Sequence, residues 1–146
     1  MMNLVIKNFD ELSNREIYEI LRARSQVFIV EEKMNCQDMD YIDFHSRHYF
    51  IEEQGRVLSY MRVYYEDETK KTIKIGRVLS IKRLVGLGRK LFESSLFDIK
   101  EYFKADKIVL HSQKQAIVFY EKLGFKVISD EYLEEDVVHA TMMLKI

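Results

Sequence analysis

The segment GRVLSIKRLVGLGRKLFESSL, residues Gly76–Leu96, constrains the fold of this chain most, because its hydrophobic period changes in the middle. Its first half is an apolar run typical of a β-strand and ends near Arg83. After Gly86 and Gly88, apolar residues recur at the spacing of an amphipathic helix, namely at Leu91, Phe92, Leu96, Ile99 and Phe103. The segment therefore predicts a strand, a glycine-containing turn and a helix in succession.

The residues at the start of the chain predict a strand, a helix and a long loop. Leu4–Phe9 is a short β-rich run, and Ser13 and Glu16 have the spacing of a capping box at a helix start. The run 31–48 is rich in carboxylates and follows neither the helical nor the strand period. We expect it to form a loop with one short helix.

Three antiparallel strands are expected in the middle of the chain. Gln54 and Gly55 join two β-rich runs, where glycine allows the positive φ of a tight hairpin. The polar run 66–71 then turns the chain into a third strand at 72–81.

The last part of the chain predicts strand, helix and two final strands. Lys107–His111 is a short buried run, and Ser112 and Gln115 repeat the capping-box spacing before a helix that Gly124 ends. Because a helix between neighbouring strands makes a crossover, the strands around Leu87–Ile108 must be parallel. We expect an α/β (α+β) fold with a mixed sheet covered by helices.

Composition limits the number of domains and the possible partners. The 146 residues are 47% hydrophobic, which favours a single domain, 1–146. Lysine plus arginine (23) nearly balance aspartate plus glutamate (24), so we expect no nucleic-acid or anionic-membrane partner. We see no signal peptide or spanning segment and expect a cytoplasmic location. Cys36 is the single cysteine, which excludes an internal disulfide and a multi-thiolate zinc site.

The glycine turn has the pattern R-x-x-G-x-G, formed by Arg83, Gly86 and Gly88. Glycines let backbone N–H groups approach an anion, and a helix N-terminus adds partial positive charge. With Arg83 and Arg89 as further donors, the turn could hold a pyrophosphate. A strand-to-helix turn that needs glycine only for its geometry is the alternative, and the pattern is neither G-x-G-x-x-G nor a P-loop.

A second motif, A-x-x-F-Y-E-K-L-G-F at Ala116–Phe125, follows the glycine turn. Together the two motifs resemble the GNAT superfamily of N-acetyltransferases, which bind acetyl-CoA. Other runs are similar to its ElaA-type branch: VFIVEE, QDMDYID, SYMRV, IGRV and DEYLEEDVVHATM. The resemblance extends from about Phe9 to Met143.

The resemblance implies a mixed, mostly antiparallel sheet of about six or seven strands flanked by helices. Strands four and five would part to admit the pantetheine arm of acetyl-CoA, and backbone groups of Val78, Leu79 and Ser80 would bind that arm. Gln113 would contact the cofactor through its side chain. The pyrophosphate would lie on the turn formed by Arg83, Val85, Gly86, Leu87, Gly88 and Arg89, in which Leu84 replaces a usual glycine.

The resemblance also implies catalytic roles. The Leu79 N–H would stabilise the oxyanion, and Tyr120 would protonate the departing thiolate, unless Tyr120 only packs in the core. The general base is left open among Glu32, His48, Glu131 and His139. Glu32 and His139 lead, with purely structural roles or a water relay as the alternatives.

The acidic loop allows further interpretations. The loop that contains Asp38, Asp40 and Asp43 could attract a cationic amine. Alternatively, acids such as Asp40 or Asp43 could pair with Arg62 and Arg77 on neighbouring strands. A calcium loop is excluded because glycine and glutamate are missing where an EF-hand requires them. A thiol hydrolase that uses the lone cysteine and a nearby histidine is a distant third function.

Two functions remain from this reasoning. The first is an N-acetyltransferase that transfers the acetyl group of acetyl-CoA, without a metal, to an amine of a small molecule or peptide by direct attack in a ternary complex. The second is a non-catalytic acyl-CoA-binding or regulatory protein. A homodimer through exposed aromatics such as Tyr64 and Tyr65 is also considered.

Overall fold

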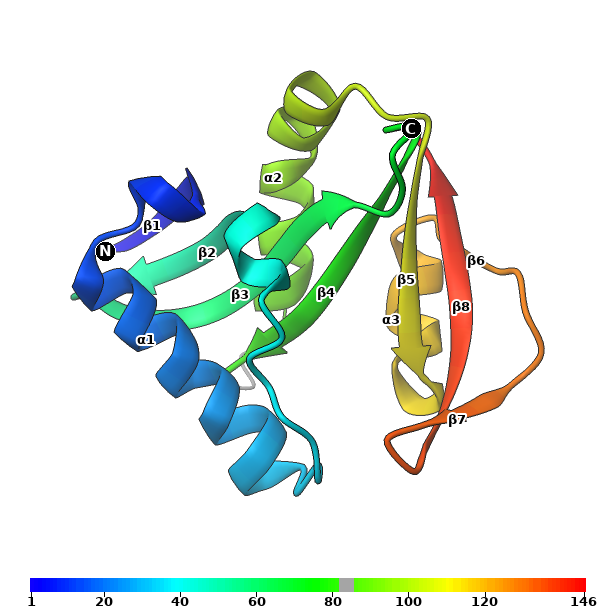
Figure 1. The fold of residues 1–146 in the computed structure, drawn as a ribbon, viewed down its shortest axis with the longest axis horizontal. Helices are drawn as coiled ribbons and strands as arrows, with labels where there is room; N and C mark the ends of the chain where they lie inside the picture. The colour runs from blue at the N-terminus through cyan, green and yellow to red at the C-terminus, as the bar shows by residue number, and fades with distance from the viewer. Residues whose placement is uncertain (82–85) are drawn as a thin grey trace.

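The computed structural model describes residues 1–81 and 86–146, which form one mixed sheet with flanking helices (Figure 1). Arg83 and Val85, two of the expected phosphate-binding residues, lie outside the described residues. The strands are β1 (Met2–Asn8), β2 (Arg47–Glu53), β3 (Arg56–Tyr65), β4 (Thr72–Ser80), β5 (Lys107–Gln113), β6 (Lys126–Val127), β7 (Tyr132–Glu134) and β8 (Val137–Lys145). The helices are α1 (Asn14–Arg24), α2 (Leu87–Phe103) and α3 (Ile117–Lys122), with short helical segments η1 (Phe9–Glu11), η2 (Ser25–Glu31), η3 (Ile42–His45) and η4 (Lys114–Ala116).

The sheet has the order β1-β2-β3-β4-β5-β8-β6, with β7 paired to β8. Among the described strands only β4 and β5 pair in parallel, which confirms the expected mixed, mostly antiparallel sheet. The sheet has eight strands rather than six or seven, because β7 adds a short hairpin. Glu135 and Asp136 form its turn, with φ values of 50° and 61°.

Local signals placed several helix and turn ends correctly. The Ser13 hydroxyl accepts the N–H of Glu16 at 3.1 Å, and the Glu16 carboxylate accepts the N–H of Ser13 at 2.8 Å. This pair caps α1 as predicted. Gln54 and Gly55 form the β2–β3 turn with φ values of 52° and 76°, and Gly124 follows α3 with a φ of 100°.

The predicted capping box at Ser112 and Gln115 is wrong. Ser112 continues β5 opposite Ala140 of β8, and its hydroxyl donates to the carbonyl of Gln113 at 2.9 Å. Strand pairing therefore prevails over the local capping signal, and α3 begins only at Ile117, after the 3-10 turn η4.

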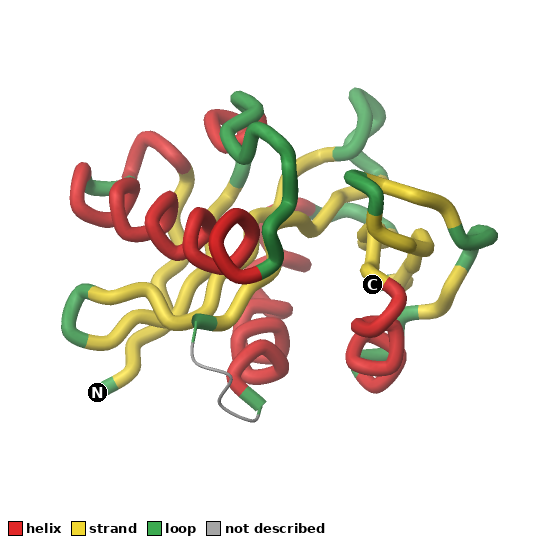
Figure 2. Tube along the Cα trace, turned by 90° about the horizontal axis from the view of Figure 1, so that it is seen from below, coloured by secondary structure: helices red, strands yellow, loops and turns green. Residues whose placement is uncertain are grey.

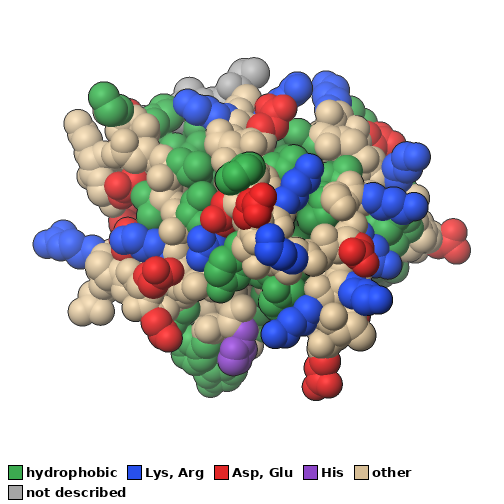
Figure 3. Space-filling model, turned by 90° about the horizontal axis from the view of Figure 1, so that it is seen from above, with side chains coloured by type: hydrophobic (Ala, Val, Ile, Leu, Met, Phe, Trp, Pro, Cys, Tyr) green, Lys and Arg blue, Asp and Glu red, His purple; other side chains and the backbone are tan. Residues whose placement is uncertain are grey.

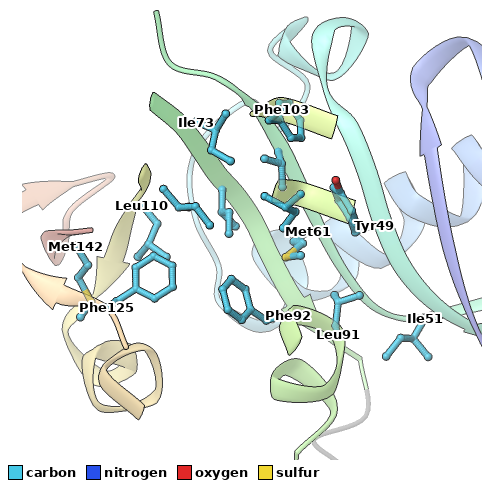
Figure 4. Close-up of a cluster of buried hydrophobic side chains, with 14 of the residues drawn as sticks. Tyr49, Ile51, Met61, Ile73, Leu91, Phe92, Phe103, Leu110, Phe125 and Met142 are labelled. Carbon is cyan, nitrogen blue, oxygen red and sulfur yellow. The ribbon is translucent and has the colours of Figure 1, made fainter. Parts of the chain in front are cut away.

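Helices α1 and α2 cover opposite faces of the sheet (Figure 2). On one face, Tyr49 of β2 belongs to the core cluster that includes Phe92 of α2 (Figure 4). On the other, the next residue of β2, Phe50, packs in a cluster with Ile20 of α1. Because successive side chains of a strand point to opposite faces of the sheet, β2 contributes side chains to both cores.

Strands β4 and β5 separate after a short paired region (Figure 1). They pair only where Thr72–Lys74 meets Lys107–Val109, although β4 continues to Ser80 and β5 to Gln113. The pairing of β3 with β4 changes register between Tyr60 and Arg62 of β3. Opposite this point, β4 has a bulge at Arg77, whose φ is 54°. Beyond the closed end, β4 therefore presents an unpaired backbone edge towards β5.

The two tyrosines considered for a dimer surface make contacts within the fold, and the dimer stays a prediction. Tyr65 donates its hydroxyl to the carbonyl of Phe103 at 2.8 Å, and the Tyr64 ring lies under the guanidinium of Arg62. Both side chains are only partly exposed.

Acidic and basic side chains are interspersed on the face shown in Figure 3. No helix within 1–81 and 86–146 is long and apolar enough to cross a membrane.

Candidate active site

A cavity of about 570 Å³ opens where β4 and β5 separate. Its walls come from β4, from β5, from η2 and the loop that follows it, and from the β7–β8 hairpin. Of the predicted site residues, the cavity brings together Glu32, Val78, Gln113, Tyr120 and His139.

The backbone N–H and C=O groups of successive β4 residues point to opposite edges of the strand. The N–H of Ile81 donates to the carbonyl of Leu58 in β3 at 2.7 Å, and the carbonyl of Leu79 accepts the Ser59 hydroxyl at 3.0 Å. Leu79 and Ile81 thus face β3, so the amides of Val78 and Ser80 face the open edge. This direction differs from the one that an oxyanion role for the Leu79 N–H requires.

The two glycines at the start of α2 have different structural environments. Gly86 is exposed, and its φ of 87° lies in the left-handed region that favours glycine. Gly88 lies in the first turn of α2, where a Cβ would meet the Phe119 ring at 3.4 Å and the Ser80 hydroxyl at 3.7 Å. Both leave the start of this helix open to an approaching group.

The other described residues of this turn have separate environments. Leu87 is buried in the core, so only its backbone is available at the helix start. The exposed Arg89 pairs with Glu93 at 3.1 Å, an ion pair of the kind that is easily exchanged in water.

Tyr120 is the residue of α3 that reaches the cavity. Its ring packs edge-on against Phe119 and Phe125, with centroids 5.1 and 5.8 Å apart. Its hydroxyl makes no hydrogen bond to a side chain or carbonyl in the described part of the chain. Burial raises the pKa of Tyr120, so the phenol stays protonated at neutral pH.

Two predicted residues meet at the rim of the cavity. Gln113 donates its side-chain amide to Glu32 at 3.1 Å, which links the end of β5 to the residue after η2. The Glu32 side chain is exposed. Gln113 is therefore placed where a ligand entering the opening would meet it.

Sequence reasoning missed two residues of the cavity wall, His111 and Glu134. The Nδ1 atom of His111 lies 2.8 Å from Glu134 Oε1. The available signal was the alternation in β5, since Leu110 and Ser112 are buried and His111 between them points to the other face.

The remaining candidates for the base have structural partners. His139 is buried, and its Nδ1–H donates to the carbonyl of Val137 at 2.7 Å. His48 lies outside the cavity, between the Tyr60 hydroxyl and the Asp43 carbonyl, and burial lowers its pKa. The exposed Glu131 pairs with Lys114 at 3.3 Å, so neither His48 nor Glu131 is placed to act on a group in the cavity.

The acidic loop is held by arginines, as one of the two interpretations predicted. Asp38 pairs with Arg24 and Arg77, and Asp43 pairs with Arg24 and Arg62. Asp40 pairs with Arg62 at 2.7 Å and with Arg77 at 3.3 Å. The arginines balance the charge of these carboxylates, and their attraction for a cationic amine stays a prediction. Within the described residues, no group of histidine, cysteine and carboxylate side chains is arranged to hold a metal ion.

Comparison with known proteins agrees with this geometry. The family described as "Acetyltransferase (GNAT) domain" matches residues 10–146. A UPF0039 protein of Schizosaccharomyces pombe is 36% identical over 149 residues, which cover 99% of this chain and 98% of the relative. The protein ElaA of Escherichia coli is 28% identical over 136 residues, covering 90% of this chain and 89% of ElaA.

Solved structures show the same arrangement. An acyl-CoA N-acyltransferase from Pseudomonas aeruginosa has a TM-score of 0.89 at 29% identity, covering 97% of this chain and 98% of that chain. Escherichia coli ElaA has a TM-score of 0.90 at 26% identity, covering 98% and 99%. With its sheet, its parted strands and a family match over nearly its whole length, the chain belongs to the GNAT acetyltransferase family.

Proposed function

We propose that this protein is an N-acetyltransferase that moves the acetyl group of acetyl-CoA to an amine of a small molecule or peptide by direct attack in a ternary complex. The observation that carries the proposal is the unpaired edge of β4, which runs along a cavity that also contains Tyr120. A protein that only binds acyl-CoA would need the open edge of β4 to hold the cofactor, but it would not need the protonated phenol of Tyr120 beside that edge. A cytoplasmic location fits this proposal, because acetyl-CoA is made and used inside cells.

The residues present fit acetyl-CoA. The open edge offers the amides of Val78 and Ser80 to an extended arm, as a neighbouring strand would be bound. The first turn of α2, with Gly86, Gly88 and Arg89, offers N–H groups and positive charge to a pyrophosphate. Arg83 and Val85, which precede Gly86 in the sequence, complete our set of proposed pyrophosphate-binding residues.

Acetyl transfer requires stabilisation of an oxyanion and a proton for the leaving sulfur. An amide fixed in a strand costs no reorganisation during the reaction, so the Val78 N–H is our oxyanion donor in place of that of Leu79. The Tyr120 hydroxyl donates its proton to the thiolate as the carbon–sulfur bond breaks. Because burial raises the pKa of Tyr120, its hydroxyl is protonated at neutral pH, so a proton is present beside the sulfur when the thiolate leaves.

Titration with acetyl-CoA and a thiol-release assay with a panel of amines test this function. We expect saturable binding by calorimetry and release of free CoA thiol with at least one amine. Tyr120→Phe should bind acetyl-CoA unchanged and lose about 10²–10⁴-fold in kcat. The control Tyr18→Phe changes an exposed tyrosine of α1 in the same way and should keep full activity.

Each outcome decides between the two functions. Binding without thiol release from a broad amine panel would support the non-catalytic alternative. Full activity of Tyr120→Phe would remove Tyr120 from the mechanism while leaving acetyl transfer intact. Absence of any heat or melting shift with acetyl-CoA would reject both functions.

A further inference from the structure

Two histidines and one carboxylate share one wall of the cavity. Glu134 of β7 lies between His111 of β5 and His139 of β8. One of its oxygens is 2.8 Å from His111 Nδ1, and the other is 3.7 Å from His139 Nε2. Tyr132 packs edge-on against His111 and stacks on His139, so one ring contacts both imidazoles.

The contact with Glu134 selects one tautomer of His111. An ionised carboxylate can only accept hydrogen bonds, so the proton in this contact belongs to His111 Nδ1. In the neutral ring, Nε2 then carries the free lone pair. The His111 side chain is 31% exposed and lines the cavity, so a group bound there can reach it.

His139 is oriented differently and is less accessible. Its Nδ1–H is used by the Val137 carbonyl, and its Nε2 faces Glu134 at 3.7 Å. Its side chain is only 5% exposed. His139 therefore supports the wall of the cavity and does not meet an acceptor.

We propose that His111 is the general base of acetyl transfer and that Glu134 is its positioning residue, an assignment that rests on the proposed N-acetyltransferase function. Nε2 of neutral His111 takes the proton that the acceptor nitrogen loses as its bond to the acetyl carbon forms. The carbon–sulfur bond breaks, and sulfur takes the Tyr120 proton. Water then removes the proton from His111 and returns one to Tyr120, so the enzyme is restored and amide plus thiol are formed.

The other charges around His111 are compatible with this role. Glu134 and Tyr132 face it from β7, and His139 faces it from β8. Across the cavity, β4 contributes Lys74 and Arg77, and the charge of Arg77 is matched by Asp38. Glu32 at the rim is held by Gln113.

The first test uses His111→Asn in the full-length protein. We expect kcat with the best amine to fall by about 10²–10⁴-fold, with an unchanged Kd for acetyl-CoA. In the wild type, kcat/KM should fall on acidification because the base must be unprotonated to act, and this limb should disappear in the variant. His45→Asn, a change at an exposed histidine outside the cavity, is the matched control and should behave as the wild type.

The second test measures the His111 tautomer directly, by ¹⁵N chemical shifts of its ring. We expect the Nδ1–H tautomer in the wild type. In Glu134→Gln the amide can donate as well as accept, so a mixture of tautomers and a lower kcat are expected, with unchanged acetyl-CoA binding. Glu134→Asp, which keeps the carboxylate, should restore part of the loss.

These measurements separate failure of the base from failure of the function. If the wild type is active and His111→Asn keeps both the rate and the acid limb of the pH profile, the assignment of His111 is overturned. Acetyl transfer itself would then be left intact. An Nε2–H tautomer in the wild type would overturn it without reference to activity. Binding of acetyl-CoA with no turnover of any amine would reject the proposed function, and the base with it.

Discussion

Gly86 and Gly88 are close in sequence, but a side chain would have different consequences at the two positions. At Gly86 the backbone is left-handed, while a Cβ there would meet no atom within 4 Å. At Gly88 the backbone is helical, and a Cβ would only come into ordinary contact with Phe119 and Ser80. The backbone conformation therefore favours glycine at position 86, whereas nothing in the described part of the free protein requires glycine at position 88.

This difference predicts opposite effects of alanine at the two positions. Gly88→Ala should keep or raise stability, by up to about 1 kcal/mol, because alanine is the better helix former. It should weaken acetyl-CoA binding, because the methyl group occupies the approach to the helix start. Gly86→Ala should cost about 1–2 kcal/mol through backbone strain. Thermal unfolding and calorimetric titration measure the two effects, and equal acetyl-CoA affinity in Gly88→Ala would contradict this role of the turn.

The predictions for single residues succeeded where the cause is local. Ser13 caps α1 because both halves of its capping box lie within one turn of chain. Ser112 has the same spacing to Gln115, but its partner strand is β8, and nothing near it in sequence shows that pairing. His111 was overlooked for the same reason, since its partner Glu134 is 23 positions away on a strand that was not predicted.

The loop between η2 and β2 is fixed to the sheet by ion pairs. Asp40 is held by Arg62 of β3 and by Arg77, the residue with positive φ in the β4 bulge. Burial alone would raise the pKa of Asp40, but the hydrogen bonds and charge of Arg62 lower it to about 2. The loop thus stabilises the bulge that precedes the Val78 amide.

This low pKa predicts how stability depends on pH. The ordinary pKa of Asp40 is 3.8 and its value in the folded protein is about 2, so the unfolded chain binds more protons between these values. The contribution of Asp40, about 2 kcal/mol, is complete above about pH 5 and is lost as the pH falls towards 2. Asp40→Asn should therefore be less stable than the wild type at pH 7, by a difference that shrinks on acidification.

Urea unfolding from pH 7 to pH 3 measures this difference. Asp10→Asn changes an exposed aspartate of η1 and should follow the wild type at every pH. A constant gap between Asp40→Asn and the wild type over the whole range would show that Asp40 is not held by its arginines.

Elements with a clear period were predicted from the sequence, and elements defined by distant partners were not. α2 runs from Leu87 to Phe103 as its apolar spacing indicated. β7 has only three residues, and two of these are partly buried by pairing with β8. The helical segment η2 continues α1 to Glu31 in spite of its β-branched residues, as the helical spacing of Ile17, Ile20, Leu21 and Phe28 indicated.

The whole molecule is a sheet closed at one end and open at the other. At the closed end, β4 and β5 pair over three residues each. Below the separated strands, Phe92 of α2 meets Phe125 edge-on at 5.7 Å, so the core continues from one half to the other (Figure 4). The opening is therefore held in place by packing. The parting of the strands itself was expected only from the family resemblance, because no local pattern in either strand encodes it.

The open edge of β4 predicts a pattern of amide hydrogen exchange across the molecule. In the free protein, the amides of Leu79 and Ile81 should be protected because they face β3, whereas those of Val78 and Ser80 should exchange rapidly. Saturating acetyl-CoA should slow Val78 and Ser80 by at least about tenfold, because the pantetheine arm takes the place of a neighbouring strand. Val63 in the β3–β4 ladder serves as the internal control and should not change. Exchange read at single-residue resolution by NMR would contradict this arrangement if Leu79 responded to acetyl-CoA and Ser80 did not.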